Sequence, residues 1–492
     1  MMDLVELPFK KNIFTFLYHK LLGVESTEVI GLIVLFLLGY SILNLWKGSL
    51  KIKEVIGLAF PIGFGAMGTI LFGYQFFTSG PIQFWALNII LLIAVLLLWI
   101  PHFIRFFRIG SSLNPFQLID KVTPIKKMES FNLIQFISLF FAFIILITIS
   151  LKGIYWPIAD WDAITTFDFY GRVIAAEGKL VNSIVLEHVV GSGVAYPPLT
   201  HLIIAYSYVC GFAEPKWVFT LFYFAFSVVF YAFMRRFVNR TASSILLLLF
   251  VSTPELIGFS AFCKTNIVQM VYACLGFIGL YIWFKDRKPL FLYLSAFMLG
   301  LNAWVRSEGI EFVMIGSLLI IYELYKKRLS WKSTIAFFAL SLSLFISWQI
   351  FMGANESLSS FQQVEIIKIP FFDADKLNTI VTHIYGHFQN IPYFAGTFYF
   401  FSIFFVLYLL FLKRNENHIF LIGIILVVVL HIFILYQINY LGDNMIWLLK
   451  YSLKRYIFNY IPLCFFFIAT TYAFGTFTKR IEEFLRWDFT GK

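Results

Sequence analysis

Acidic and basic side chains gather in one stretch of this apolar chain, between residues 152 and 196. Asp160 and Asp162 flank Trp161 there, and carboxylates so spaced can act as general bases or bind a hard divalent cation. Charge beside a bilayer is costly, so this cluster indicates chemistry. Its other polar members are Asp168, Arg172, Glu177, Glu187 and His188, and the stretch ends in Tyr196-Pro197-Pro198-Leu199.

Cations recur later in the chain, next to apolar segments. They are Lys264, Arg306 in the turn Arg306-Ser307-Glu308, and Arg455 after Lys454. The positive-inside rule predicts that these cations lie on the membrane surface that also carries the acidic stretch. The polar groups that could form a site therefore converge on one face of the membrane.

The composition places the chain among the integral membrane proteins. Of its 492 residues 60% are hydrophobic and 13% are charged, and the mean hydropathy is +0.83. A membrane-spanning backbone satisfies its hydrogen bonds within helices, which predicts an all-α polytopic protein and excludes a β-rich bundle. The net charge of +11 is typical of cytoplasmic loops facing anionic lipid, so we expect membrane lipids and no nucleic acid as partners.

Apolar runs of about 20 residues predict about 13 transmembrane helices. A further apolar stretch, 198–212, is short, and whether it spans, re-enters or lies on the membrane is left open. If it does not cross, most Lys and Arg fall in loops on one side, which places the N-terminus outside and the C-terminus in the cytoplasm. The candidate spans are 29–46, 55–77, 84–104, 131–151, 217–234, 242–260, 265–284, 289–304, 308–325, 333–352, 394–412, 418–437 and 456–474.

This topology divides the chain into three parts. Residues 1–130 form an accessory bundle of three spans, residues 131–474 a catalytic core, and residues 475–492 an amphipathic cytoplasmic tail. The core has outer loops at 152–216 and 353–393, and short interfacial helices are expected in the first of them.

The order of these motifs resembles that of the GT-C glycosyltransferases, closest to the aminoarabinose-transferase and protein O-mannosyltransferase type. The resemblance covers roughly residues 131–474. It rests on Asp160-Trp161-Asp162 followed by Gly178 and Tyr196-Pro197-Pro198-Leu199, on Asn302 to Gly309, and on Ser452-Leu453-Lys454-Arg455-Tyr456 with Pro462.

The resemblance implies an inverting transfer of a sugar from a polyprenyl-phosphate carrier to a protein, lipid or glycan acceptor on the extracytoplasmic face of the membrane. The sequence shows no processing or retention signal, so we expect this membrane to be a bacterial plasma membrane. The resemblance also implies a GT-C-like helical bundle in which Asp162, helped by Asp160, is the general base. Arg306, Arg455, Lys264, Arg172, Tyr196 and Glu308 would bind the lipid phosphate or sugar.

A divalent metal such as Mg²⁺ or Mn²⁺ is a further expectation, with Asp160, Asp162, Glu187 and His188 as candidate ligands. This sequence departs from the family pattern in two places that concern a metal. Ala163 stands where the family often has a second acid, and no acid directly precedes the proline pair.

Simpler structural interpretations compete with these roles. Asp162 would cap a helix beginning at Ala163. Arg172 and Glu177 would form a polar helix face. Arg306 would extend to lipid headgroups, and His431 would be a core histidine with its hydrogen bonds satisfied.

Two other functions remain alternatives. A polyprenyl-linked glycan polymerase or ligase is disfavoured because the 353–393 loop contains no arginine. A non-enzymatic flippase or transporter is disfavoured because such proteins carry charges or broken helices near the mid-bilayer in paired halves.

Overall fold

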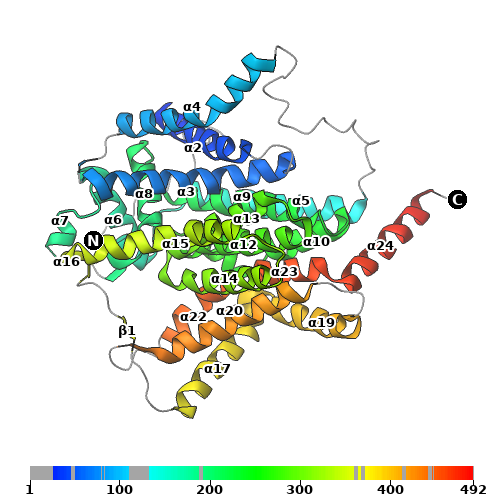
Figure 1. Ribbon diagram of the computed structural model, residues 1–492. Helices are drawn as coiled ribbons and strands as arrows, with labels where there is room; N and C mark the ends of the chain where they lie inside the picture. Colours follow the sequence, from blue (N-terminus) through cyan, green and yellow to red (C-terminus); the bar gives the residue numbers. More distant parts are fainter. Residues whose placement is uncertain are drawn as a thin grey trace, which may run out of the picture.

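Long helices packed side by side form almost the whole protein in the computed structural model (Figure 1). The structure describes residues 26–45, 50–78, 80–81, 84–109, 132–187, 192–359, 364–366, 372–412, 417–440, 446 and 448–490. Within these ranges, one short antiparallel ladder joins β1 (Val364–Ile366) to β2 (Ile438–Tyr440). The expected all-α membrane fold is confirmed apart from this ladder.

The helices coincide in position with the apolar runs of the sequence. The longer ones are α2 (Ser26–Asn44), α3 (Ile52–Thr78), α4 (Phe84–Ile109), α5 (Leu133–Tyr155), α9 (Lys216–Met234), α10 (Arg240–Val251), α12 (Thr265–Asp286), α13 (Pro289–Val305), α14 (Ile310–Tyr325), α15 (Trp331–Gly353), α17 (Ala374–Phe388), α19 (Thr397–Leu410), α20 (His418–Gln437), α23 (Ile461–Thr470) and α24 (Tyr472–Thr490).

The count of 13 crossings is not confirmed. Six of the described helices are long and apolar enough to cross a membrane, or seven if the bent pair 449–470 and 472–484 forms one span. The expected span 242–260 is divided into α10 and α11 (Pro254–Phe259). Proline lacks an N–H and disfavours a helical residue before it, so Pro254 can begin a helix but not continue one.

Helix α12 lies at the centre of the bundle. Figure 1 shows α2, α3 and α4 along one side, α17, α19 and α20 along the other, and α12 with α13 between them. In the most apolar stretch of α12, 94% of the residues are buried inside the protein. A helix that is apolar on all sides belongs in such a position.

The N-terminal helices are joined to the rest of the bundle by close packing and by charge. A Cβ atom on Gly39 would lie 1.9 Å from the Ala59 carbonyl oxygen, so α2 and α3 approach at backbone distance. The carboxylate of Glu54 on α3 is fully buried and accepts hydrogen bonds of 2.6 and 2.7 Å from Arg236 beyond α9. Of the expected accessory region 1–130, residues 1–25, 46–49, 79, 82–83 and 110–130 lie outside the described residues.

The outer loop 152–216 contains short helices, as expected. They are η1 (Ala163–Asp168), α6 (Phe169–Glu177), α7 (Ser183–Leu186), η2 (Ser192–Ala195) and α8 (Leu199–Val209). Helix α8 is the uncertain stretch 198–212, and residues 199–207 are all buried. Its 11 residues extend only about 16 Å, which is too short to cross a hydrocarbon core of about 30 Å.

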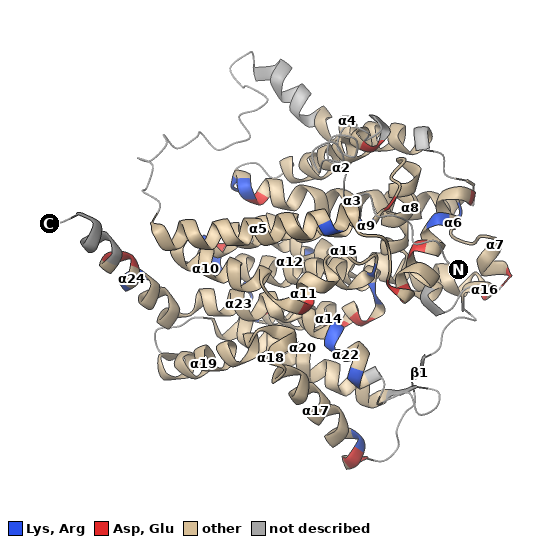
Figure 2. Ribbon diagram, turned by 180° about the vertical axis from the view of Figure 1, so that it is seen from behind, with Lys and Arg blue, Asp and Glu red and all other residues tan. Residues whose placement is uncertain are grey.

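Charged residues are sparse along the helices and gather toward their ends (Figure 2). The loop 152–216 also exposes Trp156 and Trp161, and tryptophan is enriched where a membrane meets water. The C-terminal tail continues as α24, which begins at Tyr472 rather than at residue 475. Glu482 on α24 accepts a 2.7 Å hydrogen bond from Thr241 on α10.

Candidate active site

Asp160 and Asp162 lie where the chain leaves α5 and enters η1. Asp160 Oδ1 accepts a 3.2 Å hydrogen bond from the Ala163 N–H, whereas the side chain of Asp162 caps nothing. The interpretation of Asp162 as the helix cap is therefore wrong, because Asp160 occupies that role and leaves the Asp162 carboxylate free to point elsewhere. Segment η1 is a π-helix, a form found often at functional sites.

Lys264 lies between the two carboxylates. Its Nζ is 2.5 Å from Asp160 Oδ1 and 2.8 Å from Asp162 Oδ2. The Lys264 side chain is only 6% exposed, whereas that of Asp162 is 46% exposed. Lys264 directly precedes α12, so the cation is attached to the buried central helix of the bundle.

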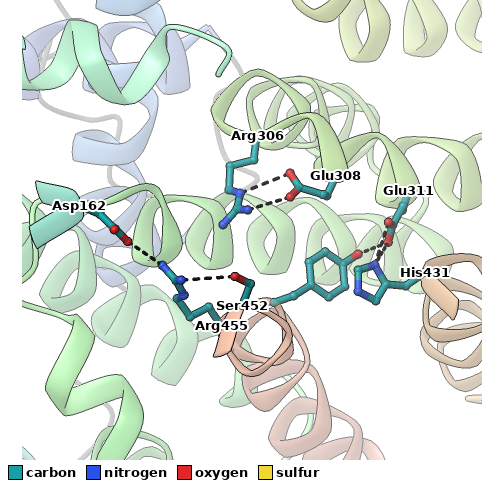
Figure 3. Close-up of polar contacts among 8 residues, drawn as sticks. Asp162, Arg306, Glu308, Glu311, His431, Ser452 and Arg455 are labelled. Carbon is teal, nitrogen blue, oxygen red and sulfur yellow. Dashed lines mark hydrogen bonds and ion pairs between the residues drawn. The ribbon is translucent and has the colours of Figure 1, made fainter. Parts of the chain in front are cut away.

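Arg455 is the second cation on Asp162. Its Nη1 lies 3.2 Å from Asp162 Oδ2, and its Nη2 donates to Ser452 (Figure 3). Burial alone would raise the pKa of Asp162, but the hydrogen bonds and positive charges of Lys264 and Arg455 hold that pKa below its ordinary value. Asp162 is therefore ionised at neutral pH.

Arg306 lies in the short turn between α13 and α14. Its guanidinium donates to Glu308 at 2.7 Å and lies 5.3 Å from the centre of the Tyr196 ring. Burial raises the pKa of Glu308, but the charge of Arg306 outweighs this effect and lowers it. Figure 3 shows the guanidinium groups of Arg306 and Arg455 facing the same region of the protein. Tyr196 and Glu308 thus lie beside Arg306.

Arg172 has partners of its own in the outer loop. It pairs with Asp168 at 2.8 Å, and its guanidinium lies 5.0 Å from the centre of the Tyr208 ring. Burial would lower the pKa of Arg172, but Asp168 and Tyr208 raise it. Asp168 is buried and also accepts a hydrogen bond from the Tyr208 hydroxyl. These contacts attach α6 to α8, so the structure does not bring Arg172 into contact with Asp162, Lys264 or Arg455.

The four candidate metal ligands are not brought together among the described residues. Asp160 and Asp162 share Lys264, and Glu187 lies exposed at the end of α7. His188 lies outside the described residues. No group of three or more His, Cys, Asp or Glu side chains that could hold a metal ion occurs in the described part of the chain. The ammonium group of Lys264 occupies the position between the carboxylates that a bridging cation would need.

Two further groups of polar residues border the site. Lys454 pairs with Glu255 at 3.1 Å and lies 4.6 Å from the centre of the Tyr393 ring, which brings the 353–393 loop beside the site. The other group is Glu311, His431 and Tyr456.

The sequence analysis did not single out Glu311, and it named Tyr456 only as part of the motif Ser452-Leu453-Lys454-Arg455-Tyr456. His431 is not fully satisfied as a core histidine, because its Nε2 is buried without a hydrogen-bond partner among the described residues. The sequence signal that could have identified this group is Glu311 itself, because an acid inside an apolar segment is costly and points to a function.

Together, these contacts place one ionised carboxylate beside two cations, Lys264 and Arg455, on segments far apart in the sequence. Such an arrangement can accept a proton and stabilise a leaving anion in one place. Comparison of the chain with protein-family models, with curated proteins and with solved structures gives no match.

Proposed function

We propose that this protein is an integral membrane glycosyltransferase of the GT-C type that uses a polyprenyl-phosphate sugar donor. The observation that carries the proposal is the meeting of Asp162 with Lys264 and Arg455, which lie 102 and 293 residues further along the chain. A carboxylate beside several cations suits an inverting transfer from a phosphate leaving group, because that reaction needs a base and charge stabilisation at once.

In the proposed step the acceptor hydroxyl oxygen attacks the anomeric carbon of the sugar. Its proton goes to Asp162, and the bond between the anomeric carbon and the phosphate oxygen breaks. The electron pair of that bond leaves with the polyprenyl phosphate. Arg306 and Arg455 would hold the phosphate through paired N–H groups, with Lys264 as a third cation.

The ion pairs of Asp162 suggest the order in which the substrates act. A carboxylate held by Lys264 and Arg455 is a weak base, because both cations stabilise its ionised form. The donor phosphate would compete with Asp162 for Arg455. Donor binding would then release the carboxylate and raise its affinity for the acceptor proton.

The finer topology belongs to the same proposal. About 13 crossings, an outer N-terminus and a cytoplasmic C-terminus would place this site on the extracytoplasmic face of a bacterial plasma membrane. The acceptor would be a protein, lipid or glycan reaching that face. The residues of the site do not by themselves form a metal centre, so no step is assigned to a metal.

The test is release of free prenyl phosphate by the purified protein in lipid vesicles. A panel of prenyl-phosphate sugars serves as donors, and membrane extract supplies acceptors. We expect release by the wild type and none by Asp162→Asn. The matched control is Glu177→Gln, because Glu177 lies in the same loop but accepts its hydrogen bonds from Ser183. Movement of intact donor across the vesicle without phosphate release would instead indicate a flippase, and wild-type release by Asp162→Asn would exclude the assigned base.

A further inference from the structure

A buried group of three polar side chains lies directly behind the two site arginines. Glu311 on α14 accepts a hydrogen bond from the Tyr456 hydroxyl, and its two carboxylate oxygens lie 2.9 and 3.1 Å from His431 Nδ1 on α20. The His431 and Tyr456 rings are stacked with centres 3.6 Å apart and planes 5° from parallel. Glu311 is fully buried, and the other two residues are 6% exposed.

Burying these groups has a cost that apolar residues would avoid. A carboxylate removed from water loses hydration free energy, which close partners only partly restore. Leucine and phenylalanine at these positions would match the apolar surroundings. The group therefore needs a reason beyond the packing of α14 and α20 against the segment that carries Tyr456.

Its position in the chain supplies that reason. Tyr456 follows Arg455 directly, and Glu311 follows Arg306 by five residues. The intervening turn is tight, because Gly309 N–H donates to the Arg306 carbonyl at 2.9 Å and a Cβ on Gly309 would lie 2.4 Å from the Asn302 carbonyl oxygen. A hydrogen bond between Tyr456 and Glu311 therefore joins the two segments that carry the arginines.

We propose that Glu311, His431 and Tyr456 are positioning residues that set the separation of Arg306 and Arg455 for binding one phosphate group. Tyr456 holds α22 (Leu453–Tyr456) against α14 through Glu311. His431 fixes the orientation of the Glu311 carboxylate and supports the Tyr456 ring from α20. The inference rests on the proposed function only in naming phosphate as the group that the two arginines bind.

The decisive variant is Tyr456→Phe, which removes the hydroxyl and keeps the ring on His431. Its matched control is Tyr206→Phe. Tyr206 is also a buried tyrosine, and its hydroxyl donates to the Gly31 carbonyl and to Asn88 in helices far from the arginines. A general loss of stability would affect both variants, whereas a change in the spacing of the arginines would affect only the first.

The first measurement needs no assumption about activity. Spin labels on Ser307→Cys and Lys450→Cys, both at exposed positions, report the distance between the two arginine segments in the full-length protein. The four native cysteines are buried. We expect a broader distance distribution in Tyr456→Phe than in the wild type or Tyr206→Phe. Equal distributions in all three would overturn the proposal.

The second measurement is binding of geranyl phosphate as a short prenyl phosphate probe. We expect Tyr456→Phe to bind it about tenfold more weakly, the loss typical of one misaligned charged hydrogen bond. Glu311→Gln should restore much of the affinity lost in Glu311→Leu, because an amide can still accept from Tyr456.

The two measurements distinguish a failure of the proposed function from a failure of the positioning role. A wild type that binds no probe counts against the proposed function, and the spin-label result then decides the positioning role alone. Wild-type affinity in Tyr456→Phe would overturn that role.

Discussion

The carboxylate of Asp162 and the guanidinium of Arg455 meet at 3.2 Å, although 293 residues separate them in the chain. Lys264 completes the contact at 2.8 Å. The loop that carries Asp162 is held in place by Asp168, which joins α6 to Tyr208 on α8. The outer loop 152–216 is thus attached to the segment that carries Arg455 by side-chain contacts, and the proposed chemistry depends on this attachment.

Removing Lys264 should shift the acid limb of the pH–activity profile to higher pH. The Asp162 pKa is lowered, so the carboxylate stays ionised, and the base functional, down to a pH below the ordinary carboxyl range. In Lys264→Met one of the groups that lowers this pKa is gone, so activity should be lost at a higher pH as the pH falls. The measurement is kcat/KM for donor against pH. Lys454→Met is the control, since Lys454 pairs with Glu255 instead; an equal shift in both variants would contradict the assignment.

Replacing either site arginine by lysine should weaken donor use although the charge is kept. Lysine cannot present two parallel N–H groups to a phosphate. We expect Arg306→Lys and Arg455→Lys to lower kcat/KM about 10- to 100-fold, the range for one charged hydrogen bond. The control is Arg287→Lys, because Arg287 lies at the end of α12 opposite Lys264 and pairs with Glu323. Unchanged kinetics in both site variants would remove phosphate binding from these residues.

Chelation should leave turnover unchanged. Lys264 already places a positive charge between Asp160 and Asp162, so the two carboxylates need no metal ion to balance them. The measurement is phosphate release before and after dialysis against EDTA, followed by addition of Mg²⁺ or Mn²⁺. Loss of activity on dialysis with recovery on addition of either ion would show that a metal is required.

Gly171→Ala should destabilise the outer loop. A Cβ at this position would lie 2.3 Å from the Ile204 side chain, where α6 packs on α8. Overpacking of this kind costs about 1–3 kcal/mol. Thermal unfolding in detergent should show a lower midpoint for Gly171→Ala, and no decrease for Gly258→Ala, where a Cβ would meet nothing within 4 Å. Equal midpoints for Gly171→Ala and the wild type would mean that α6 and α8 are packed more loosely than described.

Opposite ends of α13 should be labelled from opposite sides of the membrane. Lys288 precedes this helix and Ser307 follows it, and both residues are exposed. In intact cells an impermeant thiol reagent should label Ser307→Cys and leave Lys288→Cys unlabelled until the cells are opened. The reverse pattern would place the candidate site in the cytoplasm and contradict the positive-inside assignment.

Much of the helical framework could be predicted from the sequence, because a long apolar run in lipid has little alternative to a helix. Each of the expected spans coincides with a helix or a broken helix. The break at Pro254 could also have been predicted, since proline cannot continue a helix. The number of crossings could not, because several apolar runs form helices that are short for a span, such as α13 with 17 residues and α19 with 14.

The local sequence determined which residues were available for chemistry, namely an acid-rich loop between apolar segments and a few cations at helix ends. Only the tertiary structure decided which of them meet. Arg172 pairs with Asp168 within its own loop, whereas Arg455 pairs with Asp162 from a distant part of the chain. The reason is physical: helix formation depends on neighbours within a few residues, whereas an ion pair between distant segments depends on how every helix between them packs.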